Sequence, residues 1–175
     1  MLRGEHVTLR PLLETDAGPL AALFAHPEVA RWWLNWDEAR VRAELLDSRE
    51  AAVLAIEVEE RLAGVIMFTE EDDPDYRFAQ VDVTVAGEHV GRGLGTDALR
   101  TLLRYLIRER GHHHVLIDPA ADNARAIRAY EKVGFKPVGI LRQYERRPDG
   151  WADALLMDLV ADEFEELEAR RDASG

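Results

Sequence analysis

The chain has 175 residues, of which 47% are hydrophobic, so it is long enough to form one domain with a sizeable core. Its net charge of −12 argues against nucleic acid as a main partner, because phosphate contacts need clustered Lys and Arg. The charge would suit a cationic small molecule, and the alternative is an acidic surface that only keeps the protein soluble. The absence of cysteine excludes disulfides, thiolate metal sites and a cysteine nucleophile.

No segment approaches the roughly 18–20 apolar residues of a membrane span, and the first residues lack the apolar stretch of a signal peptide. We therefore expect a cytoplasmic protein without membrane contact, either a monomer or a homodimer. A single domain is expected over residues 1–171, with 172–175 as a frayed end.

Hydrophobic periodicity and turn residues predict alternating elements along the chain. Strands are expected at His6–Leu12, Ala51–Val58, Leu62–Thr69, Phe78–Val85, Val115–Asp118, Phe135–Tyr144 and Ala152–Val160. Helices are expected from Thr15 to Ala25, from the Asp37 cap to about Ser48, from Thr96 to about Arg110, from Asp122-Asn123 to Gly134, and from Ala161 to Arg171.

Three of the four tryptophans, Trp32, Trp33 and Trp36, lie within five residues. Such rings bury a large area and offer flat stacking faces. Two interpretations stay open at this point: a core plug between two helices, and an aromatic wall of an acceptor pocket.

An acidic run, Glu70–Asp75, has five carboxylates in six residues. Most runs of this kind are solvated turns. The alternative is an electrostatic funnel that attracts a polycation, in which Asp72 would contact the substrate.

The strand Phe78–Val85 alternates valines on one face with Asp82 on the other. A carboxylate in mid-strand costs free energy unless it is solvated or paired. Asp82 is therefore a candidate functional residue, and an Asp facing water on a half-exposed strand is the alternative.

Three glycines alternate between this strand and an amphipathic helix, at Gly91, Gly93 and Gly95. Glycine lets the backbone bring its N–H groups close to a ligand, and a helix N-terminus adds unpaired N–H groups and a positive dipole end. The stretch lacks the lysine of a Walker A loop, and Thr96 stands where a dinucleotide fingerprint needs glycine. We predict a cradle for phosphate or pyrophosphate, with a plain glycine-rich connection as the alternative.

Three consecutive histidines, His112, His113 and His114, follow the next helix. Consecutive residues on a strand point to opposite faces, and no carboxylate accompanies them at helical spacing, so we predict no metal site.

Two stretches resemble the GNAT N-acetyltransferase superfamily. The strand 80–85, the loop Val90-Gly91-Arg92-Gly93-Leu94-Gly95 and the following helix resemble its motif A, and residues 118–135 resemble its motif B. Two motifs in the right order are far more specific than either alone. Within the superfamily the sequence is most similar to aminoglycoside 6′-N-acetyltransferases, through Arg31-Trp32-Trp33, Asp82, and Asp118-Pro119 preceding Asn123.

The resemblance implies an α/β (α+β) fold: a mixed, mostly antiparallel sheet flanked by helices, splayed between strands 80–85 and 114–118 where acetyl-CoA binds. Pantetheine would pair with the strand backbone and pyrophosphate with the loop amides, with charge added by Arg92 and His89. Val90 stands where the family usually has Arg or Gln, which removes one side-chain contact. The residues expected to bind acetyl-CoA are Val83, Thr84, Val85, Val90, Gly91, Arg92, Gly93, Leu94, Gly95, Thr96, Asn123, Ala126, Tyr130 and Lys132.

Because the chain has no cysteine, direct attack of an amine on the thioester remains. The amine must lose a proton, for which Asp82 is the first candidate and Asp118 the second; Asp118 alternatively holds a second ammonium group of the substrate. The resemblance makes Tyr130 the acid that protonates the CoA thiolate, with a buried packing aromatic as the alternative. Asn123 is expected to order the loop or the pantetheine.

Three functions compete. The first is an N-acetyltransferase for an aminoglycoside-like cation, whose substrate would contact Trp32, Trp33, Trp36, Asp72, Asp82 and Asp118. The second is a ribosomal-protein-type N-terminal acetyltransferase. The third is an acyl-CoA-binding sensor without turnover, which the presence of Asp82 and Tyr130 disfavours.

Overall fold

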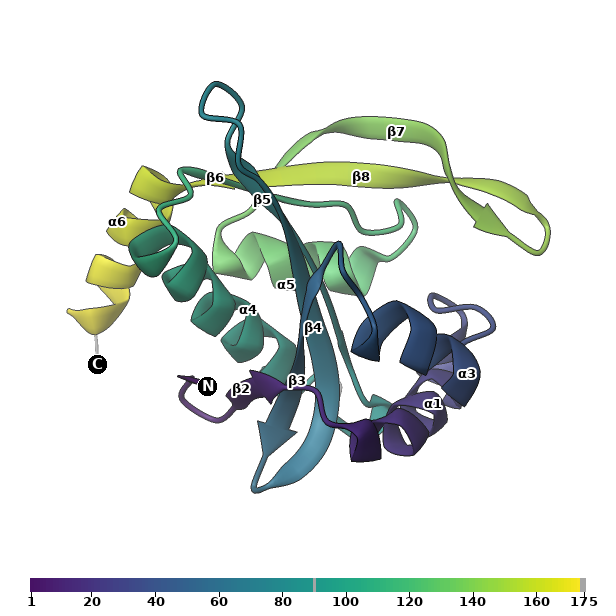
Figure 1. The fold of residues 1–175 in the computed structure, drawn as a ribbon. Coiled ribbons are helices and arrows are strands. Elements are labelled where there is room, and N and C mark those ends of the chain that lie inside the picture. The colour runs from purple at the N-terminus through teal and green to yellow at the C-terminus, as the bar shows by residue number, and fades with distance from the viewer. Residues whose placement is uncertain (90, 174–175) are drawn as a thin grey trace. The chain divides into compact units, whose positions relative to one another are not determined.

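The computed structural model describes residues 1–89 and 91–173. These residues form a mixed α/β fold whose eight described strands are hydrogen-bonded in the order β1-β2-β3-β4-β5-β6-β8-β7 (Figure 1). The chain divides into two compact units, Met1–Thr69 with Val81–Leu102, and Glu70–Gln80 with Leu103–Gly175. The expectation of a single domain over 1–171 stays a prediction.

The N-terminal segment of the first unit contains four strands that follow one another in antiparallel pairs. They are β1 (Leu2–Arg3), β2 (Thr8–Pro11), β3 (Ala52–Val58) and β4 (Arg61–Glu71), the last of which continues into the second unit. Most of the predicted strand bounds in this part are confirmed to within one or two residues. β1 is too short to leave a periodic signal, so the sequence did not predict it.

The helices of the first unit begin where the sequence places their caps. A 3₁₀ turn at Glu14–Asp16 leads into α1 (Ala17–Ala25), and the Asp37 carboxylate accepts a 2.8 Å hydrogen bond from the Arg40 amide at the start of α3 (Glu38–Val41). A π-helical turn, Arg42–Leu46, continues α3. Pro27 begins the short helix α2 (Pro27–Ala30), because the first helical position needs no backbone N–H.

Helix α4 (Leu94–Arg104), with a π-helical turn at Tyr105–Glu109, begins two residues earlier than predicted. It begins there because the Gly93 carbonyl already accepts the Asp97 amide at 2.9 Å. The predicted apolar stripe is confirmed, since its leucines are fully buried: Leu99, Leu102, Leu103 and Leu106.

The second unit holds β6 (His114–Ile117), α5 (Ala124–Val133), β7 (Lys136–Arg147), β8 (Gly150–Val160) and α6 (Ala161–Asp172). β8 pairs antiparallel with both β6 and β7, and β7 and β8 form the long hairpin of Figure 1. Gly134 ends α5 as predicted, with φ +121°. Helix α6 reaches Asp172, and residues 174–175 of the expected frayed end lie outside the described residues.

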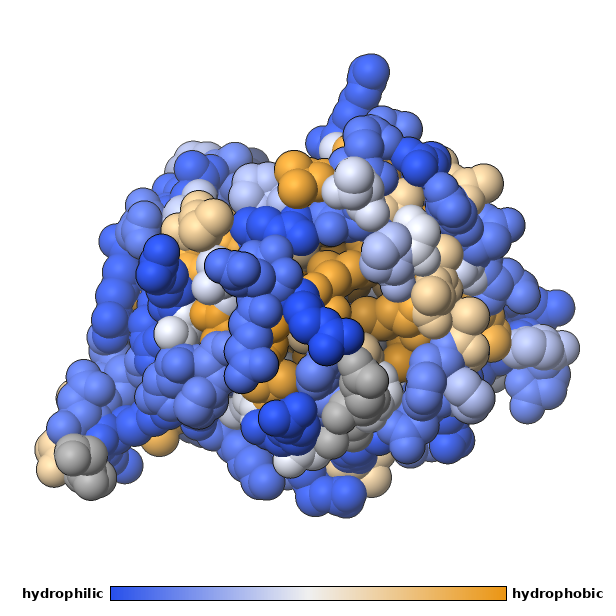
Figure 2. Space-filling model, turned by 90° about the horizontal axis from the view of Figure 1, so that it is seen from below, coloured by the Kyte–Doolittle hydropathy of each residue, from blue (hydrophilic) through white to orange (hydrophobic). Residues whose placement is uncertain are grey.

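None of the described helices has the length and apolar character needed to cross a membrane. Most of the face shown in Figure 2 is hydrophilic, as a chain with 32% charged residues leads one to expect.

One buried carboxylate in the first unit organises the start of the chain. The Asp97 side chain, 6% exposed, accepts hydrogen bonds from the amides of Glu5 (3.1 Å), His6 (2.7 Å) and Val7 (3.1 Å). These amides are turned toward α4 and not toward β3, so β2 begins at Thr8 and not at His6 as predicted.

We expect Asp97→Ala to lower the free energy of unfolding by about 3 kcal/mol, because it leaves backbone N–H groups without an acceptor in a largely buried position. Urea denaturation measures the change. Asp149→Ala, in the exposed β7–β8 turn, is the control and should change stability by less than about 0.5 kcal/mol. Equal stabilities of the two variants would contradict the role given to Asp97.

Candidate functional site

Strand β5 (Phe78–Val85) has the bounds predicted from its alternation. It pairs in parallel with β6 at Ala79–Val115 and Gln80–Leu116. Among the described residues this register covers those two pairs, although β5 continues to Val85. The short parallel pairing is compatible with the expected splay, which stays a prediction.

The far end of β5 lies unusually close to β4. A Cβ added at Gly64 would lie 2.3 Å from the Thr84 carbonyl oxygen and 3.0 Å from Val85 Cα, inside contact distance. Only glycine allows the two backbones this approach. The Thr84 and Val85 segment, predicted to pair with pantetheine, is therefore shaped by a glycine that the sequence motifs do not include.

Asp82 lies on the exposed face of β5, opposite the buried Val81, as the alternation predicts. Its Oδ1 accepts a 2.7 Å hydrogen bond from the amide of Val83. The side chain is thus solvated and locally held. Its role as a base stays a prediction.

The glycine loop is exposed and leads directly into α4. Gly91 and Gly93 both have φ +80°, and an added Cβ would meet nothing within 4 Å at either position. Glycine is therefore needed here for its left-handed backbone and not for close packing. The N–H groups of Leu94, Gly95 and Thr96 lie in the first turn of α4, where a helix offers them no carbonyl partner, and Arg92 is exposed beside them. These features fit an anion such as pyrophosphate. The prediction for Val90 lies outside the described residues.

In the second unit, Asp118 directly follows β6, and the chain after it is tied to β8. The Pro119 carbonyl accepts the Leu155 amide at 2.8 Å, and the Ala121 amide donates to the Asp153 carbonyl at 2.9 Å. Asn123 has a structural role, because its Oδ1 accepts the Ala126 amide at 3.2 Å and caps α5. The two roles expected for Asn123, ordering the loop or ordering the pantetheine, stay predictions.

Tyr130 lies on α5 and is 8% exposed, with its ring centroid 6.4 Å from that of Phe135. Packing therefore buries most of the Tyr130 side chain. The role of its hydroxyl as the acid that protonates the CoA thiolate stays a prediction. On the same helix Ala126 is half-buried and Lys132 exposed.

The tryptophans divide between two environments. Trp33 and Trp36 pack against Phe24 of α1, with centroid distances of 5.0 and 4.9 Å, which supports the core-plug interpretation for these two. The Arg31 guanidinium lies over the Trp32 ring at 4.5 Å. Contact of the three rings with an acceptor stays a prediction.

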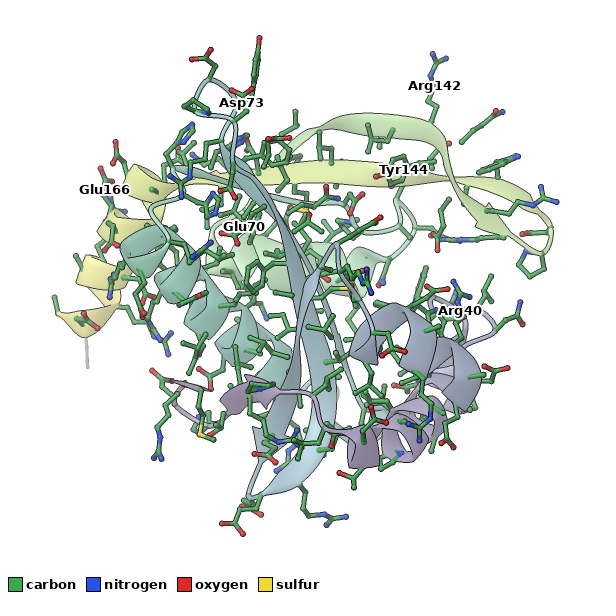
Figure 3. The ribbon with its side chains drawn as sticks, in the orientation of Figure 1. Arg40, Glu70, Asp73, Arg142, Tyr144 and Glu166 are labelled. Atoms are coloured by element: carbon green, nitrogen blue, oxygen red, sulfur yellow. The ribbon has the colours of Figure 1, made fainter. Side chains whose placement is uncertain are left out.

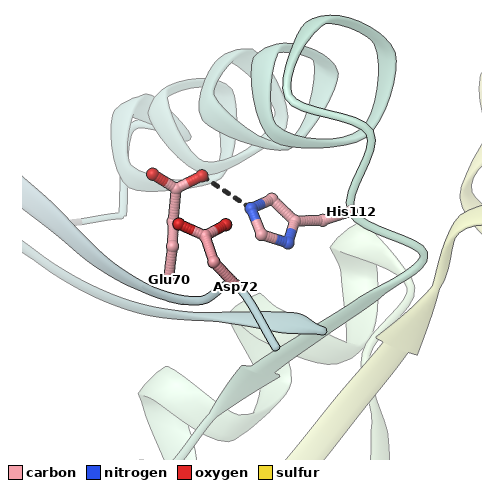
Figure 4. A group of neighbouring side chains, drawn as sticks. All are labelled: Glu70, Asp72 and His112. Carbon is pink, nitrogen blue, oxygen red and sulfur yellow. Dashed lines mark hydrogen bonds and ion pairs between the residues drawn. The ribbon is translucent and has the colours of Figure 1, made fainter. Parts of the chain in front are cut away.

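The acidic run is not uniformly exposed. Glu70 is half-buried at the end of β4; Arg110 donates to both of its oxygens at 3.0 Å, and His112 Nε2 lies 2.6 Å from Oε1 (Figures 3 and 4). Burial alone would raise the pKa of Glu70, but the hydrogen bonds from Arg110 and His112 outweigh it and hold the pKa below its ordinary value. Glu70 is therefore engaged within the protein, and any funnel is limited to Glu71–Asp75.

His112 lies near carboxylates that are distant from it in the sequence, so the residue spacing around His112 does not predict them. Potential ligand atoms of Glu70, Asp72 and His112 lie within 4.8 Å of one another (Figure 4). The Arg110 guanidinium already neutralises Glu70 at this position, so the group forms an ion-pair cluster without requiring a metal. The absence of a metal site stays a prediction.

Residues 6–136 match the acetyltransferase (GNAT) domain family, and the chain belongs to this family. It is 28% identical to aminoglycoside N(6′)-acetyltransferase type 1 of Klebsiella pneumoniae over 169 residues, which cover 83% of this chain and 80% of that protein. Its fold matches a putative acetyltransferase from T. thermophilus with a TM-score of 0.83, at 26% identity over 99% of this chain and 95% of that one. It also matches aminoglycoside acetyltransferase AAC(6′)-Ib in complex with coenzyme A, with a TM-score of 0.75, at 25% identity over 91% and 98% of the two chains.

The predicted family and fold class are thereby confirmed, and the protein is an acetyl-CoA-dependent N-acetyltransferase. The sequence motifs missed Gly64, which lets β4 approach the Thr84 and Val85 segment of the predicted site. Gly64 acts through a partner distant in the sequence, so no local pattern marks it.

We expect Gly93→Val to weaken acetyl-CoA binding about tenfold, which corresponds to about 1.4 kcal/mol, because a β-branched residue is strained at φ +80° and would reshape the loop. Calorimetry measures the affinity. Gly111→Val is the matched control: Gly111 has φ +74° and the same open surroundings but lies outside the loop. A folded Gly93→Val variant that binds acetyl-CoA as tightly as the control would contradict the cradle.

A second prediction concerns the acid stability conferred by Glu70. Its folded pKa is below the ordinary value of 4.5, so the ionised carboxylate stabilises the protein above about pH 4.5, and this contribution is lost as the pH falls through the folded pKa. Between pH 7 and pH 3, wild type should therefore lose more unfolding free energy than Glu70→Gln. Glu109→Gln, an exposed neighbour of Arg110, should follow wild type. If the unfolding free energy of all three proteins falls in parallel with pH, the ionised Glu70 carboxylate does not contribute to stability.

Proposed function

We propose that the protein transfers the acetyl group of acetyl-CoA to a primary amine of a cationic, aminoglycoside-like small molecule. The observation that carries this proposal is the likeness to the Klebsiella pneumoniae aminoglycoside enzyme over 83% of the chain. The net charge of −12 and the exposed carboxylates of Asp72 and Asp82 support a cationic acceptor.

In the proposed reaction the acceptor amine attacks the thioester carbonyl directly. An ammonium group has no lone pair for this attack, so Asp82 takes its proton, either directly or through water. The neutral amine nitrogen then bonds to the carbonyl carbon and passes its second proton to water, while the carbon–sulfur bond breaks and CoA leaves as a thiolate. Tyr130 protonates that thiolate.

We assign acetyl-CoA binding to three sets of groups. The amides of the first turn of α4, with Arg92, hold the pyrophosphate, and the backbone of Val83–Val85 pairs with the pantetheine. The half-buried Ala126 and the exposed Lys132 of α5 contribute further contacts.

The test is acetyl-CoA turnover by the purified full chain against three groups of acceptors: aminoglycosides, linear polyamines, and peptides with free N-termini. We expect turnover with aminoglycosides or polyamines, and little with peptides whose side chains carry no charge. Turnover with peptides alone would replace the proposal by N-terminal protein acetylation. Acetyl-CoA binding without any turnover would indicate a sensor.

We further expect Asp82→Asn and Tyr130→Phe to affect different limbs of the pH–rate profile. Removing a base lowers kcat on the order of 10²-fold and abolishes the acid limb, whereas removing an acid lowers kcat with the acid limb retained. Acetyl-CoA affinity, measured by calorimetry, should stay within about twofold in both variants. A normal kcat in Asp82→Asn together with a lost one in Asp118→Asn would transfer the base assignment to Asp118.

A further inference from the structure

Gly64 lies in a stretch of β4 that is buried on both faces. Its neighbours Ala63 and Val65 are both 0% exposed, and Gly64 itself is buried. The strand register pairs it with Ile56 of β3. Paired residues of neighbouring strands share a face of the sheet, so a side chain at Gly64 would lie on the same face as Ile56. Protein interiors are closely packed, so another group must fill the space that this missing side chain leaves.

The group that fills this space is the peptide between Thr84 and Val85, at the end of β5 in the same unit. A Cβ added at Gly64 would lie 2.3 Å from the Thr84 carbonyl oxygen, 3.0 Å from Val85 Cα and 3.2 Å from Ile56 Cδ1. In a regular sheet, neighbouring strands are about 4.8 Å apart and side chains stand clear of the adjacent backbone. The end of β5 therefore lies over the bare face of Gly64.

The direction of this peptide follows from the same distances. The Thr84 oxygen is the atom nearest to the added Cβ, whereas the Thr84 carbonyl carbon lies more than 3.2 Å away. Because a C=O bond is only about 1.23 Å long, this carbonyl points toward Gly64. A trans peptide is planar, with its N–H directed opposite to its C=O, so the Val85 N–H points away from β4.

Two further contacts hold the Thr84–Val85 peptide in this orientation. The Ala86 amide donates a 2.7 Å hydrogen bond to the Ala63 carbonyl, which ties the chain after Val85 to β4. A Cβ added at Gly95 would lie 3.7 Å from Val85 Cγ1, so the Val85 side chain lies beside the first turn of α4. The peptide is thus fixed between β4 and the helix whose first amides are predicted to hold pyrophosphate.

The amides of Val83 and Val85 differ in what they can donate to. The Val83 amide is already engaged, since it donates to Asp82 Oδ1 at 2.7 Å. The Val85 amide is turned away from β4, and Val85 is only half-buried. The pantetheine arm of acetyl-CoA carries amide carbonyls, which accept hydrogen bonds from backbone N–H groups. An arm that runs along this strand therefore meets the Val85 N–H as a donor.

We propose that Gly64 is a positioning residue for acetyl-CoA. Because it has no side chain, it receives the Thr84 carbonyl on its face and directs the Val85 N–H to donate a hydrogen bond to an amide carbonyl of the pantetheine arm. This inference rests on the pantetheine assignment of the proposed function. It adds a residue from a different strand than the one that is assigned to the ligand.

Gly64→Ala tests this role directly, because the new Cβ must displace the Thr84 carbonyl. We expect acetyl-CoA binding to weaken roughly tenfold, the loss of one hydrogen bond at the upper end of its usual size. The affinity for 3′-phospho-ADP, which is CoA without its pantetheine arm, should stay within about twofold, because this probe has no group that contacts Val85. Calorimetry with the purified full chain measures both affinities.

Two control variants separate this effect from others. Gly139→Ala adds the same Cβ to a strand glycine that has nothing within 4 Å, so both affinities should equal those of wild type. Val65→Ala removes a fully buried side chain and lowers stability from the opposite face of β4, and both affinities should stay within about twofold. A loss selective for acetyl-CoA in Val65→Ala, or an equal loss of both ligands in Gly64→Ala, would overturn the proposal.

Amide hydrogen exchange tests the donor in the wild-type protein, so it does not depend on how the variants fold. We expect saturating acetyl-CoA to slow exchange at the Val85 amide about tenfold or more relative to saturating 3′-phospho-ADP, since only acetyl-CoA supplies an acceptor there. Equal exchange rates with the two ligands would refute the role given to this N–H. If wild type binds both ligands equally tightly, the pantetheine assignment of the proposed function is wrong. If wild type prefers acetyl-CoA and Gly64→Ala keeps that preference, the positioning role of Gly64 alone is wrong.

Discussion

The start of the chain in the first unit is held in place by the hydrogen bonds that the buried Asp97 carboxylate accepts. A negative side chain in the first turn of α4 interacts favourably with the helix dipole, but it also lies beside the amides that are predicted to hold an anion. The three amides of Glu5–Val7 take up its charge on the buried side of the turn. The first-turn amides of Leu94–Thr96 then keep their capacity for an anion, and the N-terminal segment is anchored at the same time.

Close backbone approach is the second constraint on this unit. Gly4 lies against Asp97 and Thr101, where a Cβ would come within 2.8 Å of their side-chain oxygens, and Gly64 lies against Thr84 in the same way. In both places the missing side chain lets a backbone segment reach a partner that a larger residue would block. The Gly91 and Gly93 positions differ, because there glycine is needed for its backbone angle alone.

Several carboxylates of this acidic protein are paired with arginine side chains, which its net charge alone does not show. Arg10 bridges Asp16 at 2.6 Å and Glu57 at 2.7 Å, Arg110 holds Glu70, and Arg147 holds Asp122. Carboxylates that are paired in this way contribute little to the field outside the protein. Asp72 and Asp82 are exposed, and we propose that exposed carboxylates of this kind attract a cation.

Local chemistry made much of the fold predictable from the sequence. The alternation of Phe78–Val85 gave the bounds of β5, and Asn123 and Gly134 marked both ends of α5, because strand periodicity and helix caps act within a few residues. Only the tertiary structure decided which distant residues meet. Asp97 binds the amide of a residue 91 positions earlier in the chain, and His112 lies against Glu70. Such contacts depend on register and chain crossing, which no local pattern of residues encodes.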